Sequence, residues 1–414
     1  MKKLANVQDV VDWRMCIGCG ACLYICPSEN IKLKNYLSEG IRPKVTNSNA
    51  CSNCSDCLKV CPAVETDFDA LRISPPKDNF GKDWGIITGI WEGYASDEEI
   101  RFKGSSGGVL TAIAAYCIEQ GGMEGCLHIG QDEQDPVLNK TRLSRNRAEL
   151  MKTFGSRYSP ASVCDGLKHV EDADKPCVII GRPSEAAAVS NAIKLRPKLA
   201  EKTGVVLSFF CAETPPTKAT LSLMSKYQVK PENLEGLRYR GHGWPGYFTT
   251  RETDKDAEEE HLIYHDAWSY LQSFRPWSVH QWPDGTGELA DITCGDPWYE
   301  KPDGKSPGFS LVIAKTEKGR KIVEDAMNSG YLNLKPAERW KLEKSQSGLL
   351  AKKGAVWGRR LAHRILGLPV TNFTGANLFH AWLHLTFHEK IASTLGTIRR
   401  IVQRGYLKRL VLKD

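Results

Sequence analysis

Short apolar runs alternate with amphipathic stretches through the middle of the chain. Three apolar runs have the length of buried strands: 177–180, 205–210 and 309–315. Helices are predicted where apolar residues recur at helical spacing between breakers: 109–120, 185–194, 316–328 and the segment after Pro215 and Pro216. Strands that alternate with helices at this spacing predict an α/β domain with a largely parallel sheet.

The first part of the chain has a different pattern, with two copies of the motif CxxCxxCxxxCP. Its cysteines are Cys16, Cys19, Cys22, Cys26, Cys51, Cys54, Cys57 and Cys61. This spacing is typical of ferredoxins with two [4Fe-4S] clusters, in which the fourth cysteine of each run binds the other cluster. The predicted metal ligands are therefore Cys16, Cys19, Cys22 and Cys61 for one cluster, and Cys51, Cys54, Cys57 and Cys26 for the other. The fold predicted for this part is an α+β ferredoxin-like module.

Zinc sites and disulfides explain the cysteine pattern less well than clusters do. Zinc knuckles and ribbons use pairs of CxxC, and they do not account for a third cysteine at the same spacing and a fourth before proline. The N-terminus has no apolar run of the length that a secretory signal needs. We therefore expect a cytoplasmic protein in a reducing compartment.

Composition narrows the possible partners. The 414 residues are 41% hydrophobic and 25% charged, which is typical of soluble globular proteins with two or three domains. The net charge of +7 is modest and no recognition motif is present, so no nucleic-acid partner is expected. No uninterrupted apolar stretch reaches about 18 residues, which predicts that no segment spans a membrane.

The chain is predicted to divide into four regions: residues 1–76, 77–174, 175–344 and 345–414. The first is the ferredoxin domain, and Arg72 to Pro76 form its exit because paired prolines stop regular structure. The last is a basic helical extension that ends in a loosely amphipathic segment. That segment fits a solvated terminal helix, or peripheral contact with an anionic membrane or a partner.

Two glycine-containing segments are candidate cofactor loops. The first lies directly before the predicted helix 109–120 and contains Ser105, Ser106, Gly107 and Gly108. Free N–H groups at a helix N-terminus bind phosphate, although glycine and serine there also fit ordinary capping. The second is a turn made of Gly155, Ser156, Arg157 and Tyr158, which fits either nucleotide contact or a structural loop.

Further loops between the strands are glycine-rich, aromatic and charged. They fit either a substrate pocket or long connections: 238–246, 275–277, 283–288 and 290–296. Candidates for proton delivery in and near these loops are His242, His265, Asp291 and Asp296. The sequence assigns the catalytic role to none of them.

The order of several dispersed motifs resembles the coenzyme F420 hydrogenase/dehydrogenase beta-subunit family. These motifs are the SSGG loop, the GSRY turn, IIGRPSEAAAV, FFC, ADITCGD and VIAKTEKG, and with the ferredoxin domain they span most of residues 1 to 335. The resemblance implies a flavin enzyme with FAD in the α/β domain, beginning with the flavoprotein region at 77–174. By position, the FAD would be bound by Ser105, Ser106, Gly107, Gly108, Thr111, Gly155, Ser156, Arg157 and Tyr158.

The chain departs from that family at the position of a further cluster. Many members have four more cysteines for a third [4Fe-4S] cluster, where this chain has Ser184, Cys211, Val279 and Trp282. One thiolate cannot hold a cubane, so no third cluster is predicted, and Trp282 is expected to fill the space. We expect Cys211 to be a buried remnant rather than a reactive thiol. The same core role is expected of Cys117, Cys126, Cys164 and Cys177, whereas Cys294 stays open.

These features predict a cytoplasmic iron–sulfur flavoprotein reductase. Electrons from reduced ferredoxin or another partner protein would pass through the two clusters to FAD and on to an organic acceptor, the deazaflavin coenzyme or another small molecule. The alternative is a non-catalytic subunit that relays electrons within a larger redox complex. In a third possibility the α/β domain has lost FAD and is a scaffold, which the retained SSGG loop disfavours.

Overall fold

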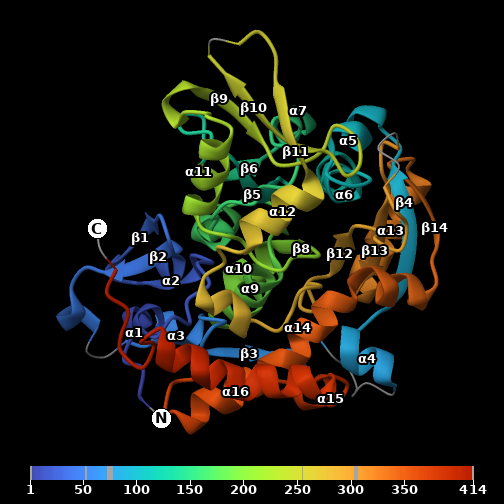
Figure 1. The fold of residues 1–414 in the computed structure, drawn as a ribbon. Coiled ribbons are helices and arrows are strands. Elements are labelled where there is room, and N and C mark those ends of the chain that lie inside the picture. Colours follow the sequence, from blue (N-terminus) through green and yellow to red (C-terminus); the bar gives the residue numbers. More distant parts are fainter. Residues whose placement is uncertain (1, 52–53, 72–77, 254, 303–305, 413–414) are drawn as a thin grey trace.

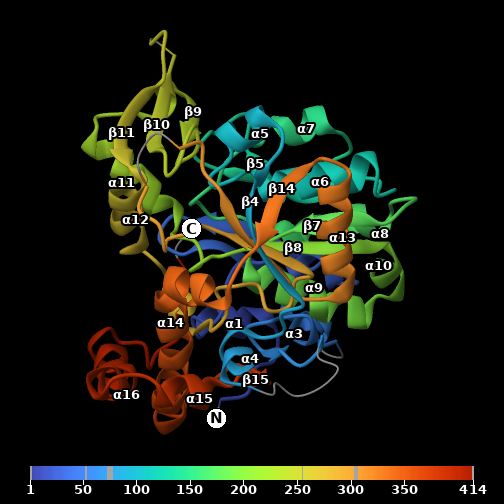
Figure 2. The same cartoon turned by 90° about the vertical axis from the view of Figure 1, so that its right-hand side faces the viewer.

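The computed structural model describes residues 2–51, 54–71, 78–253, 255–302 and 306–412. The predicted exit from the ferredoxin domain at Arg72 to Pro76 lies outside these residues. The cysteine-rich N-terminal part packs beside a large α/β domain, and the C-terminal helices run beneath both (Figure 1). A smaller antiparallel sheet rises from the far side of the α/β domain (Figures 1 and 2).

Residues 2–71 form the ferredoxin module, whose elements are short. They are α1 (Val7–Asp12), α2 (Ala21–Ile25), β1 (Ile31–Tyr36), β2 (Gly40–Val45), a 3-10 turn at Ser48–Cys51, α3 (Asp56–Lys59) and β3 (Glu65–Asp67). The strands β1 and β2 form an antiparallel hairpin. The side chain of Asn6 accepts a hydrogen bond from the backbone N–H of Gln8 and so caps α1. The small core, which contains Val7, Val10 and Ile31, also contains several motif cysteines.

The α/β domain is organised on an eight-stranded sheet with the order β14-β4-β13-β12-β8-β7-β5-β6. The strands are β4 (Gly89–Ala95), β5 (Cys126–Gln131), β6 (Asn139–Ser144), β7 (Cys177–Ile180), β8 (Thr203–Phe209), β12 (Ile292–Gly295), β13 (Ser310–Ala314) and β14 (Leu332–Pro336). The four central strands β12, β8, β7 and β5 are parallel, as predicted, and antiparallel strands extend the sheet on both sides. The predicted strand at 309–315 is β13, which is antiparallel because no crossover helix separates it from β12.

Helices cover both faces of this sheet. Their bounds are α4 (Asn79–Trp84), α5 (Glu98–Lys103), α6 (Val109–Glu119), α7 (Arg147–Met151), α8 (Leu167–Glu171), α9 (Pro183–Leu195), α10 (Pro197–Lys202) and α13 (Glu317–Asn328), with a 3-10 turn, η2, at Val163–Gly166. Helix α11 (Thr217–Lys226) follows β8 and packs with the second sheet. Successive strand residues alternate between the faces, so that Val178 packs with α6 and α13 while Ile179 packs with α9. The helices predicted at 109–120, 185–194, 316–328 and after Pro216 are confirmed as α6, α9, α13 and α11.

A second, three-stranded sheet follows α11. It consists of β9 (Leu234–Arg238), β10 (Tyr247–Glu252) and β11 (Glu259–Ile263), with 3-10 turns at Pro231–Asn233 and Trp277–Gln281 and with α12 (Tyr264–Gln272). Phe248, Leu237 and Leu271 are buried in its core, together with residues of α11. The loop 238–246, predicted as part of a pocket or as a long connection, joins β9 to β10, and its Arg240 contacts Asp296 just past β12 of the large sheet.

The C-terminal extension contains α14 (Arg339–Ile365), β15 (Asn372–Thr374), α15 (Leu378–Leu383) and α16 (Phe387–Gln403). Its helical character agrees with the prediction, but α14 begins before residue 345 and is kinked at Gln346. Strand β15 pairs in parallel with β3 of the ferredoxin module. Near the end of the chain, the Leu410 N–H donates to the Asp12 carbonyl over 2.7 Å, and Arg409 pairs with Asp9 and Asp12. The extension therefore packs onto the ferredoxin module.

One face of the extension carries exposed apolar side chains: Phe379, Leu383, Phe387, Ile391, Leu395 and Val402. Four of these side chains lie in α16, which also carries the basic residues Lys390 and Arg399. The predicted contact of the tail with an anionic membrane or a partner stays a prediction, and this face is the surface that it would use. Among the described residues, no helix is both long and apolar enough to cross a bilayer.

Candidate functional site

The eight motif cysteines form two groups, and each group combines residues from both copies of the motif. Electrostatic interactions join Cys22 to Cys19, Cys16 and Cys61, and join Cys57 to Cys51, Cys54 and Cys26. We call the first group the inner set: Cys16, Cys19, Cys22 and Cys61. We call the second group the outer set: Cys26, Cys51, Cys54 and Cys57. Cys22 also interacts with Cys57, which places the two sets next to each other.

The inner set suits a positively charged metal group. All four of its side chains are buried, and burial raises the pKa of each thiol. The negative charges of neighbouring thiolates raise the pKa of Cys22 and Cys61 further. Thiolates crowded in this way require a compensating cation, and the iron of a cluster supplies one. None of the eight thiols forms a disulfide.

Hydrogen bonds reach the sulfur atoms of both sets. The backbone N–H groups of Gly18 and Ala21 donate to Cys16 and Cys19. In the outer set, the Asn30 backbone N–H donates to Cys26 over 3.4 Å and the Asn30 side-chain amide donates to Cys51 over 3.5 Å. Such donors tune the potential of a cluster. Asn30 carries no sequence signal of this role, because only the fold brings its side-chain amide to the sulfur of Cys51.

The inner set lies directly against the α/β domain. The Cys164 N–H in η2 donates to the Cys19 carbonyl over 3.1 Å. Gly20 has a φ of +86°, and a Cβ there would lie 2.9 Å from the Asp165 backbone nitrogen. Glycine is required at this point, both for its backbone conformation and for the close approach of the two parts. In contrast, Cys26, Cys51 and Cys54 of the outer set are only partly buried.

A buried charge network adjoins the inner set on the α/β side. Arg182, which follows β7, donates to Glu213 and Glu185 over 2.9 Å each and to the Ala161 carbonyl over 3.0 Å. The two carboxylates hold the pKa of Arg182 above its usual range in spite of burial. A small cavity between the two parts is lined by residues that include Gly18, Arg42 and Arg182. The sequence analysis did not single out Arg182, although its position just after the predicted strand 177–180 could have indicated a residue of the site.

The four residues at which the sequence analysis considered a third cluster lie in this same region: Ser184, Cys211, Val279 and Trp282. Ser184 is fully buried, and Val279 lines the small cavity. Trp282 is 2% exposed and packs against Phe68 at 6.2 Å and Phe373 at 5.7 Å between ring centroids. Its indole thus fills space between the ferredoxin module and the C-terminal extension. Cys211 is only partly buried, so the prediction of a buried remnant is wrong on its burial. Desolvation still raises the pKa of this thiol to about 12, so it is neutral and weakly nucleophilic at pH 7.

The other cysteines outside the two motifs are buried: Cys117, Cys126, Cys164, Cys177 and Cys294. Cys294, whose role the sequence left open, lies in β12 within the main core. Burial alone raises its pKa to about 12. Its surroundings are those of a small core hydrophobe.

The two candidate cofactor loops meet at the carboxyl edge of the sheet. Strands β4 and β12 run in the same direction, so the SSGG loop after β4 lies at the edge where ligands bind in α/β sheets. The Ser156 N–H of the second turn donates to the Ser105 hydroxyl over 2.6 Å. The Ser106 hydroxyl donates to the Phe309 carbonyl over 2.6 Å, and the Gly107 N–H donates to the Ser310 hydroxyl over 2.9 Å.

The N-terminus of α6 fits an anionic group. Gly108 is its N-cap with φ +71°, and no side chain in the described structure caps the helix. The serine hydroxyls are used by other partners, so first-turn N–H groups and the positive end of the helix dipole stay available. Thr111, on the first turn, is partly buried. This arrangement fits the phosphates of a dinucleotide such as FAD.

Arg157 and the nearby cations are occupied within the chain. All three Arg157 side-chain nitrogens donate to acceptors in the protein: Asn139, Gln131, Leu237, Pro136 and Leu138. Arg157 therefore fixes the turn, and a contact with FAD stays a prediction for it. Arg101 stacks on Tyr94 and donates to the Gly308 carbonyl over 2.9 Å, and Lys103 pairs with Glu99.

An aromatic cluster surrounds a buried ion pair beside these loops. Arg240 donates to the two carboxylate oxygens of Asp296 over 2.9 and 2.6 Å, and lies over the Tyr264 ring at 4.1 Å. Trp244 also donates to Asp296, over 2.9 Å. Tyr264 stacks on Trp298 at 5.6 Å and contacts Tyr158 of the second turn. Asp296 follows β12, so the cluster lies at the carboxyl edge.

The four candidates for proton delivery are separated by the fold. Asp296 and His242 lie in these edge loops, where His242 stacks on Phe102 at 5.5 Å, and His265 in α12 lies 4.9 Å from Trp298. Asp291 precedes β12 and so lies at the opposite edge. It accepts from the Val206 N–H over 2.9 Å and from the Thr316 hydroxyl over 2.7 Å. Its role is to join strands, and it does not lie near the other three.

Comparisons with known proteins agree with this architecture. Residues 15–64 match the 4Fe-4S dicluster domain. Residues 90–168 and 174–339 match the N-terminal and C-terminal parts of the coenzyme F420 hydrogenase/dehydrogenase beta subunit. Together the last two matches cover more than half of the chain.

The relatives have low sequence identity to this chain, but the matches extend over most of it. The coenzyme F420 hydrogenase subunit beta of Methanococcus voltae is 25% identical over 67% of this chain and 95% of its own length. The coenzyme F420-dependent sulfite reductase of Methanocaldococcus jannaschii is 23% identical over 81% of this chain and 49% of its own length. A chain of the F420-reducing [NiFe] hydrogenase complex of Methanosarcina barkeri has a similar fold, with a TM-score of 0.51 and 20% identity over 68% of this chain and 96% of its own.

Proposed function

Because the chain belongs to the coenzyme F420 hydrogenase/dehydrogenase beta-subunit family and contains a 4Fe-4S dicluster domain, we propose that it is an iron–sulfur flavoprotein oxidoreductase. Its inner and outer sets would each hold one [4Fe-4S] cluster. Electrons would pass from a redox partner protein such as ferredoxin to an organic two-electron acceptor, the deazaflavin coenzyme or another small molecule. Relatives with F420-linked names support this acceptor class.

The observation that carries the proposal is the unequal burial of the two sets. The outer set is partly exposed, whereas the inner set is buried against η2 and the Arg182 network. Electrons from a protein partner would therefore enter at the outer cluster and leave the inner cluster toward the α/β domain. Each half of this path has its own tuning groups, Asn30 on the outer side and Arg182 on the inner side.

FAD is the group that we propose for the carboxyl edge of the sheet. It would couple the one-electron chemistry of clusters to two-electron transfer. The uncapped N-terminus of α6 would hold its phosphates, and the hydrogen bond from Ser156 to Ser105 would keep the two loops together. The aromatic cluster around Arg240 would exclude water from the site.

The experiment is the cofactor content and reactivity of protein purified without oxygen. We expect about eight irons, as two cubane clusters require, and one FAD per chain. Thr111→Glu should lower the FAD content because it places a carboxylate where phosphate would bind, while the helix dipole tolerates that charge. Thr111→Gln, of equal size, should retain FAD. Full iron without flavin in the unmodified protein would contradict the flavoprotein proposal.

The alternative, a relay subunit of a larger redox complex, is favoured by the names of relatives that are subunits. The same preparation separates the two functions. A reductase oxidises its reduced flavin with a small acceptor such as the deazaflavin coenzyme. A relay subunit accepts electrons through its clusters but is reoxidised only when a partner protein is added.

A further inference from the structure

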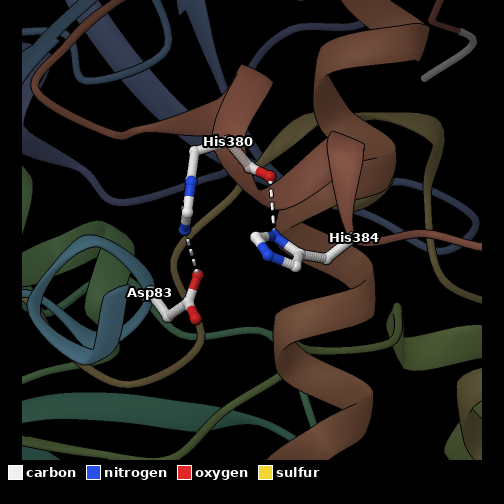
Figure 3. A group of neighbouring side chains, drawn as sticks. All are labelled: Asp83, His380 and His384. Carbon is white, nitrogen blue, oxygen red and sulfur yellow. Dashed lines mark hydrogen bonds and ion pairs between the residues drawn. The ribbon is translucent and has the colours of Figure 1, made fainter. Parts of the chain in front are cut away.

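Asp83 and two histidines near the end of the chain meet beneath the α/β domain. Asp83 lies near the end of α4, His380 lies in α15, and His384 directly follows α15 (Figure 3). One nitrogen or oxygen atom from each of them lies within 4.8 Å of the others. The helices α4 and α15 are in contact, so the arrangement is part of the packed structure.

The distance between Asp83 and His380 suits two ligands of one metal ion. The Asp83 Oδ1 and His380 Nε2 atoms are 3.5 Å apart. Both atoms are buried and neither has a hydrogen-bond partner. Two ligands at about 2.0–2.1 Å from a tetrahedral zinc ion lie about 3.4 Å apart. The observed separation is long for a hydrogen bond and close to the edge of such a tetrahedron.

His384 completes the set with a free imidazole nitrogen. Its Nδ1 lies 2.9 Å from the His380 carbonyl, which favours the tautomer with the proton on Nδ1. The Nε2 lone pair is then available to a metal. His380 and His384 are four residues apart, and their ring centroids are 4.6 Å from each other. Two histidines at this spacing are a common zinc-binding arrangement in helices.

We propose that Asp83, His380 and His384 bind one zinc ion or a similar divalent transition metal, with water in the fourth position. Two imidazoles and one carboxylate are the donors that zinc accepts. The nearby Lys353 does not oppose the ion strongly, because its ammonium group donates to Glu288 over 2.7 Å and to the Asp83 carbonyl over 2.8 Å. These three residues take no part in the proposed electron path, so the inference is independent of that function.

The ion would fasten the C-terminal extension to the α/β domain. Helix α15 follows β15, which pairs with β3 of the ferredoxin module, whereas α4 leads into β4 of the large sheet. A metal shared by α4 and α15 would thus attach the extension to the α/β domain, in addition to the β15–β3 pairing with the ferredoxin module. The competing explanation is a simple ion pair between protonated His380 and Asp83. The 3.5 Å between the two atoms is longer than the separation in a hydrogen-bonded ion pair, which does not favour this explanation.

The test uses cluster-loaded protein at pH 7.5, dialysed without oxygen against zinc at a buffered micromolar concentration. Bound zinc and iron are counted, and the melting temperature is measured with and without zinc. We expect one zinc per chain with unchanged iron, and a zinc-dependent rise in melting temperature. His384→Gln, at an exposed position, and His380→Gln should abolish both effects. His388→Gln, on the neighbouring helix, should retain both effects.

Two outcomes would overturn the proposal. One is unmodified protein that retains no zinc under these conditions. The other is zinc bound equally by His384→Gln and by the unmodified chain, because the ion would then lie elsewhere, such as on cysteines that had lost iron. Since His384 is exposed, its replacement should leave the fold intact and keep the comparison valid even if His380→Gln fails to fold.

Discussion

The inner and outer sets have the same ligand chemistry but opposite surroundings. All four inner cysteines are buried against the α/β domain, whereas three of the four outer cysteines are partly exposed. Polar groups of the α/β domain lie beside the inner set, and the outer set has Asn30 from its own module. Two cysteine sets of the same composition would thus acquire different tasks from their positions alone in the proposed function: the outer set suits a protein partner and the inner set suits internal transfer.

The largest expected effect comes from exchanging one ligand in each set. Cys61→Ser removes an inner ligand and Cys26→Ser an outer one, although their sequence positions suggest the reverse. Each should lose about four of about eight irons. Cys61→Ser should abolish acceptor reduction with any donor, while Cys26→Ser should abolish it with ferredoxin and retain it with a small reductant. Iron analysis and steady-state rates with both donors provide the measurement.

The comparison fails if the two variants behave alike with the small reductant. It also fails if Cys61→Ser perturbs the spectrum of the outer cluster and leaves the inner one intact. In that case each motif copy would hold its own cluster, and the grouping across the two copies would be wrong.

Replacing Trp282 should have the next largest effect, on stability. Trp282 packs between Phe68 and Phe373 and is 2% exposed. Trp282→Ala should lower the free energy of unfolding by about 3–5 kcal/mol, because it removes buried contacts and leaves a cavity. Chemical denaturation of the cluster-loaded protein measures this. An exposed tryptophan offers the control, since Trp340→Ala should cost far less.

A smaller effect is expected at the contact of the inner set with η2. Gly20→Ala and Gly122→Ala both place alanine at positive φ, which costs about 1–2 kcal/mol in either case. Only at Gly20 does the new Cβ meet another part of the chain, 2.9 Å from the Asp165 nitrogen, whereas at Gly122 nothing lies within 4 Å. Gly20→Ala should therefore be the less stable of the two and slow electron transfer into the α/β domain. Equal melting temperatures and rates would show that the close approach is unimportant.

The smallest effect is expected on the reduction potential of the cluster in the outer set. Asn30→Ala removes the amide that donates to Cys51 but leaves the backbone N–H that donates to Cys26. Loss of a hydrogen bond to sulfur destabilises the reduced cluster, so the outer potential should fall while the inner potential stays unchanged. Redox titration followed by electron paramagnetic resonance resolves the two clusters. Asn49→Ala, at an exposed position, serves as the control and should shift neither potential.

Much of the fold was predictable because it depends on local patterns. The helices α6, α9, α11 and α13 and the strands β7, β8 and β13 follow from apolar spacing and from breakers such as Pro216. The antiparallel direction of β13 was not predictable, because apolar runs do not encode strand direction. The contact of the C-terminal extension with the ferredoxin module was also missed, since β15 is short and its partner β3 is about 300 residues away.

The candidate site likewise has features that the sequence predicted and features that only the fold reveals. The cysteine spacing and the SSGG loop could be recognised in the sequence because backbone geometry at clusters and helix termini restricts nearby residues. Asn30, Arg182 and the group of Asp83, His380 and His384 could not, because each has its role only through partners that folding brings to it. For Arg157 the sequence correctly indicated a turn near the candidate cofactor site. The structure shows that the side-chain nitrogens of Arg157 donate hydrogen bonds to other residues of the protein.

The sequence by itself determined the type of metal chemistry, the α/β class and the family resemblance, since these depend on spacing over short stretches. Only the tertiary structure decided that one cysteine set is buried against the α/β domain and the other faces outward. It also decided that Asp291 lies apart from the other proton-delivery candidates, at the opposite edge of the sheet. The physical reason is that burial and electrostatic environment are properties of packed surfaces, and these surfaces form between segments that are distant in the chain.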